Sequence, residues 1–279
     1  MEGDVRTLER RLQALKRHGA NVLLVGASGI DEACSRLLGS DDADRRRLFV
    51  LGDGASATPE QRGASWGYDP DRVGVVDVPF GGTRGTVTDW TVGDGGRDGP
   101  ESPDGPATPD SPGEPSGSED PGGQAEAVEP VEPVGPDSGL SDGPVPWARE
   151  SDDPWYSRTG PSDLSAAARH AHVHLSRFET SDPEPSEIRV CLDPLCGFAA
   201  ESEPADLRRF LEVLTNRVRM ARGMGHYHLS ATESDGLRED IEPLFDATVE
   251  TRVTEAGSVH QRWTLHADDL TTDWLPLRP

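Results

Sequence analysis

Short apolar runs alternate with helical segments along two stretches of this chain, and this alternation restricts the possible fold more than any other sequence feature. The run at residues 21–26 is short and mostly apolar, as in a strand that is covered on both faces. The predicted strands span residues 21–26, 46–53, 71–79, 188–193 and 225–231. Strands that alternate with helices form a mostly parallel sheet through right-handed crossovers, so the sequence predicts an α/β fold.

The helical segments carry start and stop signals. Asp4 caps the first predicted helix and Gly19 ends it. In the longest helix Pro204 occupies the first turn and Gly223 follows the last one. The predicted helices span residues 4–19, 30–39, 162–178, 204–223 and 236–246, and the last of them is broken near Pro243.

The hydrophobic period changes at the C-terminal end of the chain. Residues 247–253 and 259–266 alternate between apolar and polar side chains on either side of the turn sequence TEAGS. This pattern predicts an antiparallel hairpin, and residues 271–277 are expected to add a last short strand.

Residues 91–146 differ in composition from the rest of the chain. They contain no aromatic residue, 12 of the 24 prolines, and 13 acidic residues against one basic residue, so they carry about half of the net charge of −24. Such a segment buries too little apolar surface to offset the entropy of ordering it. The sequence predicts a disordered acidic insert over residues 82–160, which divides one α/β domain into the parts 1–81 and 161–279.

The charge composition restricts the partners and the compartment. Lys16 is the single lysine of the chain, and all other basic residues are arginines. Acid excess with so little lysine resembles proteins of halophilic archaea, although a GC-rich genome would also favour arginine codons. No basic patch stands out, so neither nucleic acid nor an anionic membrane is expected as a partner. The charged first residues and the lack of a long apolar run predict a cytoplasmic protein without signal peptide or membrane span.

The opening strand and helix, NVLLVGASGIDEACSRLLG (21–39), have the outline of a phosphate loop. Gly26 and Gly29 supply a tight turn, but the pattern G-x-x-x-x-G-K-[ST] is missing there and elsewhere in the chain. Asp31 and Glu32 occupy the first helical turn, where carboxylates suit the helix dipole and would repel a triphosphate. The two glycines equally suit close packing of the turn.

The strand IRVCLD (188–193) ends in an acid, Asp193. In phosphate-loop ATPases a strand of this kind carries the acid that orders a magnesium-bound water. The order of glycine turn, crossovers, acid-tipped strand, long helix, HYHLS strand and terminal hairpin resembles the core of RecA/KaiC-like ATPases. The segments RRRLFVLGD, LRRFLEVLTNRVR, LFDATVE and QRWTLH resemble a haloarchaeal group of such proteins that lacks the loop lysine.

This resemblance covers residues 1–80 and 162–279 and implies a RecA-like three-layer domain. It implies a vestigial nucleotide site made of Gly26, Ser28, Gly29 and Asp193. Asp53 stands where related ATPases often carry a catalytic Glu. Two plainer interpretations remain: Asp193 is a strand-end acid that caps a turn, and Asp53 forms a turn with the glycine after it.

Cysteines and histidines offer a different chemistry. Cys34, Cys191 and Cys196 form no C-x-x-C pair and are expected to be reduced, buried thiols. Histidines cluster twice, and the members of these two groups are His170, His172 and His174 on a helix and His226 and His228 on a strand. Two such groups could build a zinc or nickel site, but histidines on a helix flank are usually solvated. His228 could instead sense a γ-phosphate in the RecA-like order.

The sequence therefore favours a non-catalytic RecA/KaiC-like protein, a pseudo-ATPase without a cofactor that acts as a regulatory or scaffold protein. A protein partner is expected, and an oligomer would fit the resemblance. Two alternatives stay open: a weak nucleotide-binding switch and a metal-binding protein that uses the histidine groups. The segment PWARESDDPWYS (146–157) is either a docking motif or a stretch whose aromatic side chains pack back on the domain.

Overall fold

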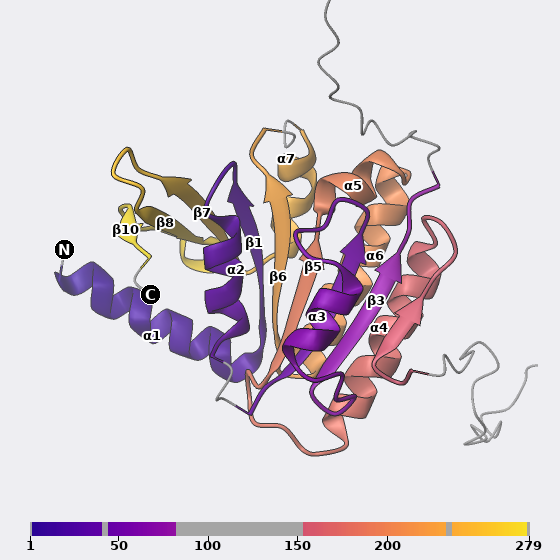
Figure 1. The fold of residues 1–279 in the computed structure, drawn as a ribbon. Helices are drawn as coiled ribbons and strands as arrows, with labels where there is room; N and C mark the ends of the chain where they lie inside the picture. The colour runs from indigo at the N-terminus through magenta and orange to yellow at the C-terminus, as the bar shows by residue number, and fades with distance from the viewer. Residues whose placement is uncertain (1, 41–43, 82–152, 233–235, 278–279) are drawn as a thin grey trace, which may run out of the picture. The chain divides into compact units, whose positions relative to one another are not determined.

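A ten-stranded mixed sheet forms the centre of the computed structural model, which describes residues 2–40, 44–81, 153–232 and 236–277 (Figure 1). The strands follow the order β10-β8-β7-β1-β6-β5-β2-β3-β4, and β9 pairs with β8 beside this path. All neighbours from β7 to β4 are parallel, whereas β8 pairs antiparallel with β7, β9 and β10. The predicted α/β fold with a mostly parallel sheet is confirmed.

The central strands are those that the apolar runs predict. Their bounds are Ala20–Gly26 for β1, Arg46–Gly52 for β2, Val73–Val78 for β3, Ile188–Asp193 for β5 and Met224–Ser230 for β6. Nearly every residue in these strands is buried. Because helices cover both faces of the sheet, strands that are apolar on both sides are stable at its centre.

The helices form one layer on each face of the sheet (Figure 1). One face, here called the α2 face, is covered by α1 (Glu2–His18), α2 (Ile30–Leu38) and α3 (Pro59–Ser65). The other, the α6 face, is covered by α4 (Leu164–Glu179), α5 (Leu195–Ala200) and α6 (Pro204–Met220).

Side chains of β1 alternate between these two layers. Val22 and Leu24 belong to the core of the α2 face, and Leu23 and Val25 belong to the core of the α6 face. This alternation follows from the two-residue period of a strand, and it assigns every side chain of the parallel strands to one layer.

The C-terminal segment forms the predicted hairpin. β7 (Ala247–Val253) pairs antiparallel with β8 (Val259–Leu265), and two short strands, β9 (Leu270–Thr271) and β10 (Leu275–Pro276), extend it. β7 also pairs parallel with β1, so the hairpin continues the central sheet. The predicted break near Pro243 is also present, because α7 (Leu237–Ile241) gives way to the 3-10 turn η1 (Glu242–Leu244).

Three α-helices and strands of the described residues lie outside the helices and strands that the sequence predicts. The first is α3, whose N-cap residue Thr58 forms a capping box with Gln61, with Pro59 in the first turn. α5 is the second, and it follows directly after β5. The third, β4 (Tyr156–Arg158), pairs with β3 and falls within residues 82–160, which the sequence assigned to the insert. The remainder of that insert, 82–152, lies outside the described residues.

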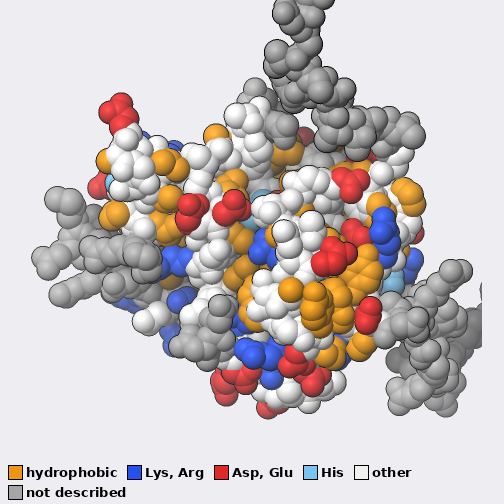
Figure 2. Space-filling view, viewed as in Figure 1, with side chains coloured by type: hydrophobic (Ala, Val, Ile, Leu, Met, Phe, Trp, Pro, Cys, Tyr) orange, Lys and Arg blue, Asp and Glu red, His pale blue; other side chains and the backbone are white. Residues whose placement is uncertain are grey.

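Aromatic side chains gather beside β4. Trp155 packs edge-on against Tyr68, with the ring centroids 5.0 Å apart, and lies 5.5 Å from the ring of Tyr156. Figure 2 shows hydrophobic side chains gathered over α3 and the adjacent part of the sheet. For Trp155 the structure therefore agrees with packing on the domain, while Trp147 lies outside the described residues. No helix in the described ranges is both long and apolar enough to cross a membrane.

Candidate functional site

The expected phosphate loop is a short turn between β1 and α2. Gly26 is the last residue of β1, and Gly29 precedes α2 with a left-handed φ of +77°. A Cβ on Gly26 would lie 2.1 Å from Thr251 Oγ1, and the Thr251 hydroxyl donates a hydrogen bond of 2.8 Å to the carbonyl oxygen of Ser28. A Cβ on Gly29 would lie 2.7 Å from Val259 Cγ1. The two glycines thus allow the hairpin to pack closely against this turn.

Asp193 ends β5, and the protein holds both oxygens of its buried carboxylate. The backbone N–H and the hydroxyl of Ser56 donate to Oδ2 at 2.8 and 2.7 Å, and Oδ1 lies 3.3 Å from His228 Nδ1. Burial acts to raise the pKa of Asp193, but the hydrogen bonds with His228 and Ser56 outweigh burial and lower it. This geometry fits the interpretation of Asp193 as a strand-end acid that holds a neighbouring turn.

Asp53 lies at the end of β2 and forms a turn with Gly54, whose φ is +85°. Its Oδ2 accepts a hydrogen bond of 2.9 Å from the backbone N–H of Phe80. The side chain therefore ties the end of β2 to the segment after β3, as expected for a turn-forming Asp-Gly pair.

Four buried side chains converge on the α2 face of the sheet. We call them the Cys/His cluster; its members are Cys34 of α2, Cys191 of β5, and His226 and His228 of β6. One sulfur or ring nitrogen atom from each residue lies within 4.8 Å of those of all the others. These are soft and borderline donor atoms, of the kind that bind transition metals.

Sheet register brings the strand members together. Cys191 and His226 are direct partners in the parallel pair of β5 and β6. The two-residue period places both histidines of β6 on the α2 face, while Tyr227 and Leu229 between and after them point into the core of the α6 face. Cys34 completes the cluster because it lies on the buried side of α2.

Distances within the cluster are short. Cys34 Sγ lies 3.9 Å from Cys191 Sγ and 3.3 Å from His226 Nε2. Cys191 Sγ lies 3.6 Å from His228 Nε2. The cluster is therefore a closed set of four donor atoms that face one another.

The cluster changes the acidity of its members. The hydrogen bond with Cys191, together with the adjacent His226, lowers the pKa of the Cys34 thiol well below its usual value. The hydrogen bond with Cys34 and burial raise the pKa of Cys191. Burial opposes the charged form of His228, but the hydrogen bonds with Asp193 and Cys34 raise its pKa to about 9.

The model of a family of unknown function, DUF7504, matches residues 19–117 and 107–251. The chain belongs to this family. Cys34 lies in the first DUF7504 stretch, and the other three members of the cluster lie in the second. A search of curated proteins found no match to the chain.

The structure of this DUF7504 chain separates the two predicted histidine groups. The group on α4 lies in the layer that covers the α6 face, across the sheet from the Cys/His cluster. His174 is buried, with Nε2 3.1 Å from Ser157 Oγ, and His172 Nδ1 accepts a hydrogen bond of 3.0 Å from Arg217 Nε. A metal site that joins both groups does not form, and the histidines of β6 meet two cysteines instead.

The expectation of buried thiols is confirmed in part for this DUF7504 member. Cys34 and Cys191 are buried and Cys196 is half-buried, and none of them is part of a disulfide. Two of them, Cys34 and Cys191, lie beside the histidines of β6. The spacing of these cysteines in the sequence did not indicate that Cys34 and Cys191 would meet in the fold.

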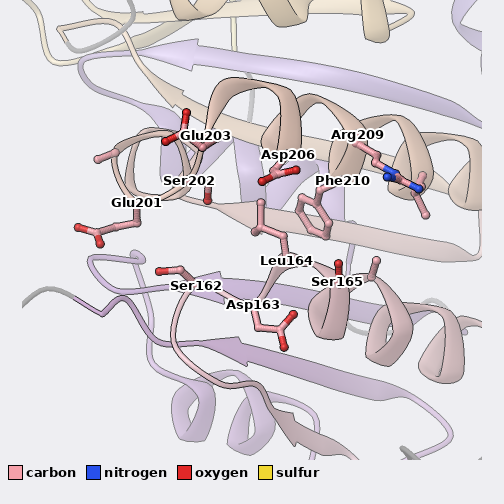
Figure 3. A pocket seen from close by; sticks show the side chains of 13 residues that line it. Ser162, Asp163, Leu164, Ser165, Glu201, Ser202, Glu203, Asp206, Arg209 and Phe210 are labelled. Carbon is pink, nitrogen blue, oxygen red and sulfur yellow. The ribbon is translucent and has the colours of Figure 1, made fainter. Parts of the chain in front are cut away.

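A groove of about 810 Å³ opens on the α6 face where α4 and α6 begin (Figure 3). Leu164 and Phe210 face each other between the two helices at its base. The charged residues that line the groove are Asp163, Glu201, Glu203, Asp206 and Arg209. The groove therefore offers apolar surface beside an excess of negative charge.

Proposed function

We propose that this protein is a non-catalytic RecA/KaiC-like regulatory or scaffold protein, a pseudo-ATPase that acts through protein contacts. The observation that carries the proposal is the contact between Thr251 and the glycine turn. A phosphate loop needs free space beside its glycines so that backbone N–H groups can approach the phosphates. Here the Thr251 side chain fills the space beside Gly26 and bonds to the carbonyl oxygen of Ser28.

The charges around the turn support the same proposal. Asp31 and Glu32 are exposed in the first turn of α2, where they interact favourably with the helix dipole and would repel a phosphate. Asp193, the acid that the resemblance relates to magnesium, already has Ser56 and His228 as partners. A nucleotide would have to displace these contacts before it could use the carboxylate.

The order of the elements agrees with a RecA-like layout. A glycine turn after β1, an acid at the end of β5, the long helix α6, the strand β6 and a terminal hairpin follow one another along the chain. Helices cover both faces of the sheet, which gives the three layers that the resemblance implies. These features support descent from a RecA-like core that has kept its sheet and lost the residues that bind and hydrolyse a nucleotide.

The groove between α4 and α6 is the surface that we assign to the partner protein. Its apolar base and its excess of acidic over basic side chains are complementary to a segment that presents a basic residue next to an apolar one. Such a segment would place its apolar side chain between Leu164 and Phe210 and its basic group near Asp206.

The test is a thermal melt of the full chain in molar KCl, with and without Mg-ATP and Mg-GTP, together with an assay of phosphate release. Binding to the native state raises its stability by RT ln(1 + [L]/Kd), so millimolar nucleotide would reveal even a weak site. We expect neither a shift of the melting temperature nor turnover. A shift or steady turnover that disappears in Asp193→Asn would overturn the proposal in favour of a nucleotide switch.

A further inference from the structure

We propose that the Cys/His cluster is the binding site of one Zn²⁺ ion, which fastens α2 to β5 and β6. The proposal goes beyond the regulatory function and does not depend on it. It follows from the spacing of the four donor atoms, from their burial and from the hydrogen bond that orients one of the histidines.

The spacing of the donor atoms matches a tetrahedral zinc site. With Zn–S bonds of about 2.3 Å and Zn–N bonds of about 2.0 Å, tetrahedral angles require about 3.8 Å between sulfurs and about 3.5 Å between sulfur and nitrogen. The sulfurs of Cys34 and Cys191 are 3.9 Å apart. The sulfur–nitrogen distances are 3.3 Å from Cys34 to His226 and 3.6 Å from Cys191 to His228. All four donor atoms lie within 4.8 Å of one another, so one ion fits once the side chains move inward.

Burying the four polar side chains of the cluster costs free energy unless they share a cation. The exposed fractions are 2% for Cys34, 0% for Cys191, 2% for His226 and 3% for His228. Thiols are weak hydrogen-bond donors and acceptors, so the hydrogen bonds that these four side chains form with one another offset little of the cost of burying them. A cation at the centre binds all four lone pairs together and removes two thiol protons.

Asp193 prepares His228 for this role. Because Oδ1 of the carboxylate lies 3.3 Å from Nδ1 of His228, the ring proton is held on Nδ1. Metal binding displaces the proton from Nε2, and the freed lone pair of this atom points toward Cys191 Sγ and the centre of the cluster. Histidines that bind metals commonly donate their other N–H to a carboxylate, which fixes the tautomer and orients the ring. Asp193 is therefore a positioning residue of the site.

The donor set selects the metal. Two thiolates and two imidazoles in a tetrahedral arrangement suit Zn²⁺, whereas Mg²⁺ and Ca²⁺ require oxygen ligands. Four protein ligands complete a tetrahedron and leave no position for water or substrate, as in structural zinc sites. The ion would therefore stabilise the fold and would not take part in catalysis.

The ligands connect distant parts of the chain. Cys34 is 157 residues from Cys191 and 192 residues from His226 in sequence. Binding in the folded state would therefore join the N-terminal helix layer to strands from the last third of the chain. Since the site does not exist in an unfolded chain, metal binding is coupled to folding.

The first test uses the full wild-type chain, produced without a histidine tag and kept reduced in molar KCl. Elemental analysis should find close to one zinc per chain. After removal of metal by a chelator, titration with Co²⁺ should produce the intense visible bands of a tetrahedral site and a near-ultraviolet thiolate-to-cobalt band, both displaced by Zn²⁺. A weak octahedral spectrum without the thiolate band, or no saturable uptake of metal, would overturn the proposal.

The second test assigns the ligands. Cys34→Ser should remove the contribution of one of the two thiolates to the thiolate band and weaken Zn²⁺ binding by more than about 100-fold. Cys196→Ser is the matched control, because Cys196 is a reduced cysteine outside the cluster, and it should keep both properties. Equal losses in the two variants would overturn the assignment. If Cys34→Ser fails to fold, His226→Gln provides a second ligand variant, and the wild-type cobalt spectrum decides the result by itself.

Discussion

Asp193 Oδ1 lies 3.3 Å from His228 Nδ1, so the acid that ends β5 supports a histidine of the Cys/His cluster. Ser56 holds the other oxygen of this carboxylate from the loop after β2. The hydroxyl of Ser56 in turn accepts a hydrogen bond of 3.2 Å from Arg62 of α3. A buried cluster and a surface loop are therefore connected through one carboxylate.

Replacing this carboxylate should weaken metal binding without abolishing it. Asp193→Asn removes the charge that holds the Nδ1 proton of His228, and loss of such an outer carboxylate lowers metal affinity by about 10–100-fold. Competition with a chromophoric chelator measures the affinity, and the stoichiometry should stay at one ion per chain. Asp53→Asn, at the end of the neighbouring strand β2, should leave the affinity unchanged. An equal loss in both variants would contradict the role assigned to Asp193.

The packing of the glycine turn predicts a coupled pair of substitutions. Gly26→Ala should lower the free energy of unfolding by about 1–3 kcal/mol, because its Cβ would lie 2.1 Å from Thr251 Oγ1. Adding Thr251→Ala removes the clashing atom, so the double variant should be more stable than Gly26→Ala alone. Denaturant unfolding of the four proteins in this cycle measures the coupling. Purely additive effects would show that the two residues do not compete for one space.

A buried hydrogen bond joins β1 to β6. The Tyr227 hydroxyl donates to Asn21 Oδ1 at 2.8 Å, and both residues are fully buried. Tyr227→Phe leaves that oxygen without this donor and should cost about 1–3 kcal/mol of unfolding free energy. Tyr68→Phe, at an exposed tyrosine, should change it by less than about 0.5 kcal/mol. Denaturant unfolding at fixed salt compares the two, and similar small losses would contradict the importance of the buried bond.

His174 should make stability depend on pH. Burial lowers the pKa of this histidine from 6.5 to about 3, so it stays neutral in the folded state. Below its ordinary pKa the unfolded chain binds one more proton than the folded one. The free energy of unfolding should therefore fall by about 1.4 kcal/mol for each pH unit as the pH drops from about 6.5 toward 3.

A variant isolates this contribution from that of other titrating groups. His174→Gln does not titrate, so its unfolding free energy should fall less steeply over the same pH range than that of the wild type. Denaturant unfolding at a series of pH values from neutral to mildly acidic measures both slopes. Parallel slopes would show that His174 is not held neutral in the folded protein.

The long elements could be predicted because each carries its own signals. β5 is a short, mostly apolar run, and α6 has Pro204 in its first turn and a regular apolar face. β4 has three residues and depends on its partner β3, so no local pattern could indicate it. α3 does carry a local signal, the capping box of Thr58 and Gln61, followed by Pro59.

The Cys/His cluster could not be predicted from spacing, because its members come from three elements far apart in sequence. Their meeting depends on the strand order, which places β5 beside β6, and on the register that pairs Cys191 with His226. A shift of one residue would turn these side chains to the opposite face of the sheet. The available hint was the alternation of histidines in GHYHLS, which placed both on one face.

The position of β1 has a consequence for synthesis of the chain. Both neighbours of this strand, β6 and β7, are formed by residues after Gly223, so β1 leaves the ribosome long before any strand that pairs with it. Contacts of such high sequence separation form slowly and leave apolar segments unprotected in the meantime. β1 is thus translated well before its neighbours and stays exposed until the residues after Gly223 have been made.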